Sequence, residues 1–226
     1  MRSRRFVLPA IIAGLALLTG CAPQAAAPSA SPTKTAAAPS ATPTPTPADA
    51  VASRVVVHSQ TVDVVAEDGS TIASVRYFDP ATDMVAALTK AFKAEPVVTP
   101  DAGGNETPSG TRYTWGGFAI VDRDVEQAEP YSPALAAFWD TADVNGVRVE
   151  TVDGIAVGDA AEPLAEGHPD GLFRNPNNGE LSVRVDVALL PLNADYGDKP
   201  SFAVALVGVT DGPVARMIAP SGNWGV

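Results

Sequence analysis

The chain has 226 residues, 15 basic and 26 acidic side chains, a formal net charge of −11 and a single cysteine. An acidic balance of this size repels nucleic acid and anionic lipid headgroups, so nucleic acid is excluded as a partner. One cysteine excludes a disulfide framework, so a folded domain in this chain must be stable through packing alone.

The first twenty residues have the layout of a secretory signal. Three arginines within residues 1–5 precede an apolar run over residues 6–18, and small residues follow it. The run is about 13 residues long, whereas about 20 are needed to span the hydrocarbon core of a membrane. The pattern therefore predicts a removed signal peptide over residues 1–20.

The end of this segment decides which kind of signal it is. The sequence Leu18-Thr19-Gly20-Cys21 resembles the lipobox of bacterial lipoproteins. That resemblance implies cleavage between Gly20 and Cys21 and lipidation of Cys21, which becomes the mature N-terminus. Two or three acyl chains, at about 0.8 kcal/mol per buried methylene, give lasting attachment. We expect a lipid anchor at the extracytoplasmic face of the cell membrane; the alternative is a free cysteine after an ordinary signal peptide.

The next segment, residues 21–50, consists of this cysteine and a tether. Between residues 22 and 50 the chain is built from Ala, Pro, Thr and Ser, apart from Gln24, Lys34 and Asp49. Such a composition buries too little apolar surface to offset the entropy of ordering, which predicts disorder. In extended polyproline geometry the tether could reach about 90 Å at ~3.1 Å per residue.

Residues 51–226 are predicted to form one extracytoplasmic domain. Three arginines lie in the signal, and Lys34 and Asp49 in the tether. The domain therefore keeps 11 basic and 25 acidic residues, a net charge of −14.

The first half of the domain begins with a predicted hairpin. Strands over 55–66 and 71–78 flank the turn sequence Glu-Asp-Gly-Ser at 67–70. A helix is predicted over 80–93, with Asp79 as its cap, a proline at its first position and apolar residues at a spacing of four.

Four further elements are predicted before residue 170. They are a strand over 111–121, interrupted by two glycines, a short helix that opens at Ser132, a strand over 145–152, and a short helix between Asp159 and Gly167. The last of these has an acid three residues after Asp159, which is the spacing of a capping box.

Three strands close the chain, over 181–189, 202–210 and 214–219. The first alternates apolar and polar residues along its whole length, as a half-buried antiparallel strand does. The fold class is therefore α+β: an antiparallel sheet with two or three short helices. The sequence Pro-Ser-Gly occurs at both 108–110 and 220–222, each time shortly before Trp-Gly. This repeat would be expected if the domain consisted of two related halves, and that alternative stays open.

Two short segments carry a family resemblance. Asp-Gly-Ile-Ala-Val-Gly-Asp at 153–159 and Ile-Ala-Pro-Ser-Gly at 218–222 resemble uncharacterised cell-envelope lipoproteins of actinobacteria. The resemblance implies an extracytoplasmic location and no particular activity.

Few residues are candidates for chemistry. The two histidines, His58 and His168, have no cysteine, histidine or carboxylate at metal-ligand spacing, and no nucleophile or phosphate-binding motif is present. We therefore predict no catalytic residue, no metal and no cofactor. Alternate acids at 122–126 and the oxygen-rich segment 175–180 could bind Ca²⁺, but a solvated strand end and a tight turn explain them better.

Aromatic residues beside glycines offer one candidate binding surface. Tyr113, Trp115 and Trp224 could stack against a carbohydrate or peptide; the alternative is that Tyr113 and Trp115 pack in the core. A long tether without catalytic residues favours non-enzymatic binding of an envelope protein or wall component. Two alternatives remain: a solute-binding lipoprotein and a cell-envelope hydrolase.

Overall fold

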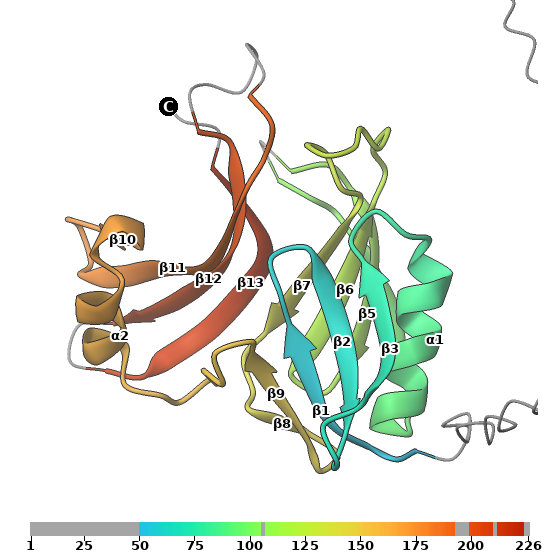
Figure 1. The fold of residues 1–226 in the computed structure, drawn as a ribbon. Coiled ribbons are helices and arrows are strands. Elements are labelled where there is room, and N and C mark those ends of the chain that lie inside the picture. Colours follow the sequence, from blue (N-terminus) through green and yellow to red (C-terminus); the bar gives the residue numbers. More distant parts are fainter. Residues whose placement is uncertain (1–49, 105–106, 193–198, 210–211, 224–226) are drawn as a thin grey trace, which may run out of the picture. The chain divides into compact units, whose positions relative to one another are not determined.

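Two β-sheets of different size make up most of the structure (Figure 1). The computed structural model describes residues 50–104, 107–192, 199–209 and 212–223. The predicted signal peptide, Gly20, Cys21 and nearly all of the predicted tether lie outside these ranges. None of the helices within them is long and apolar enough to cross a membrane.

The smaller sheet has five strands in the order β3-β2-β1-β9-β8. The strands are β1 (Ala52–Val57), β2 (Thr61–Ala66), β3 (Thr71–Arg76), β8 (Asp143–Val144) and β9 (Val147–Thr151). β1 runs parallel to β9, whereas the other pairs are antiparallel. This sheet is therefore mixed.

The larger sheet has eight strands in the order β10-β11-β12-β13-β7-β6-β5-β4, and every neighbouring pair is antiparallel. The strands are β4 (Val97–Asp101), β5 (Gly110–Trp115), β6 (Phe118–Arg123), β7 (Leu135–Trp139), β10 (Leu172–Arg174), β11 (Glu180–Leu189), β12 (Ser201–Val209) and β13 (Val214–Asn223).

Helices are few in the described part of the chain. They are α1 (Ala81–Phe92), α2 (Ala161–Gly167) and the single 3₁₀ turn η1 (Pro169–Gly171). The α+β class agrees with the structure at the coarse level, but the fold is richer in sheet than the sequence predicted. The segments 108–110 and 220–222 are not equivalent, because the first leads into β5 and the second lies inside β13.

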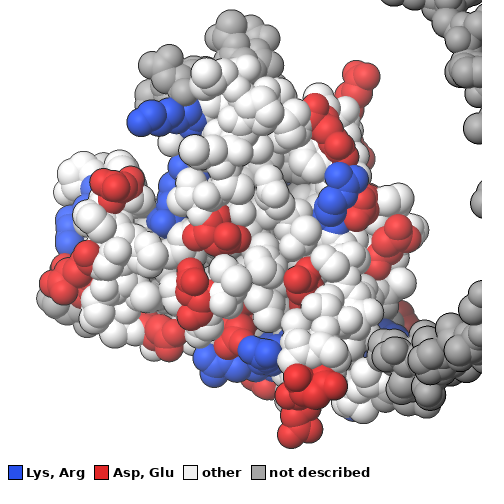
Figure 2. Space-filling model, viewed as in Figure 1, with Lys and Arg blue, Asp and Glu red and all other residues white. Residues whose placement is uncertain are grey.

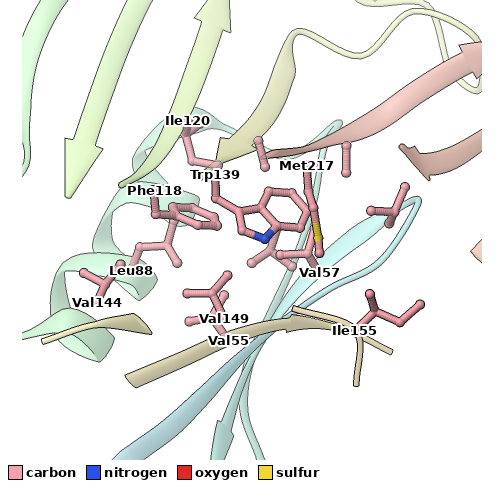
Figure 3. Packing of buried hydrophobic residues seen from close by; sticks show 14 of the residues in the cluster. Val55, Val57, Leu88, Phe118, Ile120, Trp139, Val144, Val149, Ile155 and Met217 are labelled. Atoms are coloured by element: carbon pink, nitrogen blue, oxygen red, sulfur yellow. The ribbon is translucent and has the colours of Figure 1, made fainter. Parts of the chain in front are cut away.

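The core lies where α1 and the two sheets meet. α1 packs along β1, β2 and β3 through its apolar face, and Phe92 at its end reaches Trp115 and Phe118 of the larger sheet. Figure 3 shows Trp139 and Met217 of the larger sheet facing Val55, Val57 and Val149 of the smaller one. The two sheets therefore share one hydrophobic core.

Several predicted elements are confirmed. The turn at 67–70 joins β2 to β3, the helix at 80–93 is α1, and the strand at 145–152 contains β9. The three closing strands are β11, β12 and β13, the last of which continues to Asn223.

Two predicted single strands are wrong because each is a hairpin. The segment 55–66 turns at His58, whose backbone N–H donates to Thr61 O at 2.9 Å. Ser59 is the single common turn residue here, and no Gly, Pro, Asn or Asp accompanies it, so the sequence gives only a weak signal for this turn. The segment 111–121 turns at its two glycines, where an added Cβ on Gly117 would lie 2.5 Å from the Asp140 carboxylate.

The predicted helix from Ser132 is also wrong. Residues Leu135–Trp139 form strand β7, which lies between β6 and β13 in the middle of the larger sheet. Four of its five residues are buried, so both of its faces are covered and the alternation typical of a strand is lost.

Neither predicted helix cap is formed. The Asp79 carboxylate accepts hydrogen bonds from the backbone N–H and the guanidinium of Arg76, and Asp159 accepts from the backbone N–H of Ala156. Both acids stabilise the turn before the helix rather than the helix itself.

Candidate binding groove

A groove of about 410 Å³ lies beside the end of α2 and is the candidate site; we call it the α2 groove. Figure 2 shows this face as a hollow between the region of α2 and β10 and the centre of the domain, with positively charged side chains toward it. The groove is lined by Gly167, His168, Pro169, Asp170, Gly171, Arg184, Val187, Leu189, Lys199, Ser201 and Asn223.

A bulge in β11 shapes one wall of the α2 groove. The pairing of β11 with β12 shifts between Val185 and Ala188, and Asp186 within the bulge has a φ of +49°. Before the bulge Arg184 pairs with Ala205, and after it Leu189 pairs with Ser201. Because side chains alternate along a strand, both Arg184 and Leu189 project from the outer face of the sheet.

The 3₁₀ turn η1 forms the opposite wall and touches β11 directly. An added Cβ on Gly171 would lie 2.6 Å from the carbonyl oxygen of Arg184, so only glycine allows this approach. The N–H of Gly171 donates to His168 O at 3.0 Å, which closes the turn. His168 itself ends α2 by donating its N–H to Leu164 O and Ala165 O.

Arg184 is the central charged group of the groove. Its Nη2 donates to Ser201 O at 3.2 Å, Ser201 Oγ at 3.3 Å and Ser221 O at 2.9 Å. No carboxylate of the described residues pairs with it, and its Nε is buried without a hydrogen-bond acceptor. Burial lowers the pKa of Arg184 below its ordinary value, with no neighbouring acid to offset it. Among the described residues, therefore, no carboxylate is paired with this positive charge at the groove.

Two exposed apolar side chains, Val187 and Leu189, line the same groove, and three others lie on adjacent parts of the chain. Nine large hydrophobic residues of the described chain are exposed, and five of them lie on β10, on β11 or just after β11. These five are Leu172, Phe173, Val187, Leu189 and Leu192. Leu189 is 72% exposed and Phe173 62%.

Comparison with known protein families, curated proteins and solved structures gives no match for this chain.

A second cluster of polar groups lies on the other side of β11, around His58. The Nε2 atom of His58 is 3.4 Å from Asp63 Oδ2, and its Nδ1 is 3.9 Å from Asp186 Oδ2. The same Asp186 oxygen accepts the backbone N–H of Ser59 at 2.6 Å, and Tyr77 Oη donates to His58 O at 3.2 Å. The cluster therefore joins the turn between β1 and β2 to the bulge in β11.

The charges of this cluster support one another. The nearby carboxylate of Asp63 raises the pKa of His58 above its ordinary value against the opposing effect of burial, and Asp186 and Asp153 add to the rise. Burial opposes the charged form of Asp63, but hydrogen bonds from His58 and Ser74 outweigh it and lower the pKa of that carboxyl. Burial raises the pKa of Tyr77 well above its ordinary range, so Tyr77 stays a neutral donor.

The raised pKa of His58 predicts a pH dependence of stability. A raised folded-state pKa contributes stability that is complete below the unfolded-state value, near 6.5, and is lost as the pH rises through the folded-state value. We expect the free energy of unfolding in urea to fall as the pH rises above about 6.5. His58→Gln should flatten this slope, while His168→Gln, the matched control, should keep it. An unchanged slope in His58→Gln would contradict the assignment.

The histidine cluster does not form an open active site. The nearest cavity, of about 120 Å³, is lined by Ser59, Gln60 and Tyr77 but not by His58, Asp63 or Asp186. In the described part of the chain, no three of the His, Cys, Asp and Glu residues are placed to hold a metal ion.

The aromatic residues predicted for ligand stacking lie elsewhere. Trp115 is 2% exposed, contacts Phe92, and donates its Nε1–H to Ala94 O at 3.0 Å, so it is a core residue and not a stacking surface. Tyr113 is half-buried and packs against the same core. Trp224 lies outside the described residues. The core interpretation thus holds for Trp115.

The two oxygen-rich segments also have structural explanations. Strand β6 ends at Arg123, so the acids at 122–126 do not share one strand face. Burial and the charge of Asp124 raise the pKa of Asp122. In segment 175–180, Asn175 and Asn178 accept backbone N–H groups within a tight turn.

Sequence reasoning missed the α2 groove and the partners of His58. Arg184 has the alternation of an ordinary solvent-facing strand residue, and its acceptors on Ser201 and Ser221 are 17 and 37 residues away. Asp186 is 127 residues from the Ser59 amide that it binds. The only local signal was Asp63, five residues after His58, which the turn at 58–60 folds back beside it.

Proposed function

We propose that this chain is an extracytoplasmic lipoprotein, anchored through lipid on Cys21, whose tethered domain binds an envelope protein or wall component without catalysing a reaction. The observation that carries the binding function is that two exposed large apolar side chains, Val187 and Leu189, line the α2 groove beside Arg184. Exposed apolar clusters of this kind mark interaction sites in soluble domains. The anchor rests on the lipobox resemblance at residues 18–21.

The structure offers less support for the two other classes. A solute-binding lipoprotein that closes two lobes around its ligand is built on parallel βαβ units, whereas β1 and β9 form the single parallel pair among the described strands. A hydrolase needs its acid and base in a cleft with a nucleophile. His58, Asp63 and Asp186 are close together but line neither the α2 groove nor the cavity beside Tyr77.

The anchor predicts a specific response to Cys21→Ala. Without the thiol there is no site for the diacylglycerol thioether, so the chain should move from the membrane fraction to the soluble fraction. Metabolic labelling with a fatty acid, followed by fractionation and immunoblotting of the tagged chain, measures both effects. Thr19→Ala is the matched control, because it changes the preceding segment and keeps the thiol. Equal membrane association and labelling of the Cys21→Ala variant and the wild-type chain would contradict the anchor.

Binding is tested by crosslinking the tagged, full-length chain in its own cells and identifying co-purified proteins by mass spectrometry. We expect enrichment of one envelope component over the Cys21→Ala chain. Leu189→Ala should reduce this enrichment, and Val97→Ala, an exposed apolar residue on the edge strand β4, should not. Equal loss with both variants, or enrichment unaffected by Leu189→Ala, would exclude the α2 groove as the contact.

A further inference from the structure

The α2 groove combines a fixed cation with a small apolar surface. Arg184 is held by three hydrogen bonds that all use Nη2, which leaves Nη1 without an acceptor among the described residues. Lys199 lines the groove and makes no ion pair with a described residue. Val187 and Leu189 form the adjacent exposed apolar part.

A partly buried positive charge without an anionic partner has a free-energy cost, which a bound anion would reduce. Charged side chains with reduced solvent contact are normally paired, because removal from water disfavours the charge. In this domain acids outnumber bases by 25 to 11, yet no carboxylate of the described chain pairs with Arg184. A guanidinium with a free donor is well suited to an anionic oxygen.

The lining of the groove narrows the class of anion. Asp170 on η1 partly offsets the two cations, so a singly charged group fits better than a phosphate dianion. Polar groups such as His168 and Ser201 alternate with the apolar ones, which suits a peptide backbone better than a hydrocarbon chain. The volume of about 410 Å³ is within the range of small-ligand sites.

We infer that the α2 groove binds the C-terminal carboxylate of a short peptide, with Arg184 as its principal partner and Val187 and Leu189 in contact with an apolar side chain. This inference rests on the binding function proposed above and specifies its ligand. Capture of a terminal carboxylate by positive groups is an established mode of peptide recognition. Lys199 adds a second, more exposed positive charge.

The test compares two probes that differ only at the terminus. N-acetyl-Ala-Ala-Leu with a free carboxylate and the same peptide as its C-terminal amide are titrated into the purified full chain by calorimetry and ligand-observed NMR. We expect the acid to bind at least roughly tenfold more tightly than the amide, because a charge-assisted hydrogen bond is lost in the amide. Added salt should weaken the binding of the peptide with the free carboxylate and leave the binding of the amide unchanged.

Variants then locate the site. Arg184→Gln should reduce binding of the acid roughly tenfold and leave the amide nearly unchanged, and Arg216→Gln, on β13 outside the groove, is the matched control. Leu189→Ala should weaken the binding of both peptides. Because Arg184 also bonds to two neighbouring strands, circular dichroism must confirm the fold. If Arg184→Gln does not fold, the exposed Lys199→Gln variant replaces it and should weaken only the acid.

Three outcomes would overturn the inference. Equal binding of acid and amide would remove the carboxylate from recognition, and competition by inorganic phosphate at equal concentration would indicate a general anion site. Absence of binding by both peptides to the folded chain would exclude this ligand class. If a crosslinked partner that depends on Leu189 is still found, the proposed binding function stands and only its ligand assignment falls.

Discussion

Phe92→Ala is expected to destabilise the domain by about 3–5 kcal/mol, the usual cost of truncating a fully buried phenylalanine. Phe92 has no exposed surface, and its ring centroid lies 6.0 Å from that of Trp115 and 5.6 Å from that of Phe118. The ring joins the end of α1 to the larger sheet, so its loss leaves a cavity where three elements meet. Since stabilities of domains are about 5–15 kcal/mol, this loss would be a large fraction.

Urea denaturation followed by tryptophan fluorescence measures this effect, because Trp115 and Trp139 are buried close to the same contact. Phe92→Leu should cost less, since most of the apolar volume remains. Phe173→Ala is the matched control: the same truncation at a 62% exposed position should change the free energy by at most about 0.5 kcal/mol. A loss below about 1 kcal/mol for Phe92→Ala would mean that the three elements do not depend on this residue.

Local pattern predicted the elements whose residues face one core and one solvent side. Strand β11 is the clearest case: Leu181, Val183 and Val185 are buried and the residues between them are not. Helix α1 could be predicted equally well, because its buried residues Met84 and Leu88 lie four positions apart in the sequence. In both elements tertiary burial agrees with the sequence period, so the sequence alone was sufficient.

Prediction failed where tertiary surroundings change that period. β7 is buried on both faces by its place between β6 and β13, so its apolar run has no alternation and was taken for a helix. The turn at 58–60 is held by distant groups, Asp186 and Tyr77, rather than by a turn sequence. The candidate site depends on the same kind of long-range pairing, which explains why Arg184 gave no local signal.

Gly171→Ala, in the wall of the α2 groove, is expected to have the second large effect on the stability of the domain. A Cβ at this position would lie 2.6 Å from Arg184 O and 3.2 Å from Arg184 Cβ, and a backbone oxygen inside a sheet cannot move aside. The 3₁₀ turn η1 must then shift away from β11. Overpacking of this kind costs about 1–3 kcal/mol. Thermal and urea unfolding of the variant measure that loss.

The same substitution also separates the shape of the groove from its charge. Gly171→Ala keeps Arg184 and Lys199 but moves the wall that carries His168 and Asp170, so we expect weaker binding of the carboxylate peptide without loss of its salt dependence. Gly104→Ala, outside the groove, is the matched control, because a Cβ there would meet no atom within 4 Å. If Gly171→Ala bound the peptide as tightly as Gly104→Ala, η1 would not be a wall of the site, and recognition would depend on β11 and β12 alone.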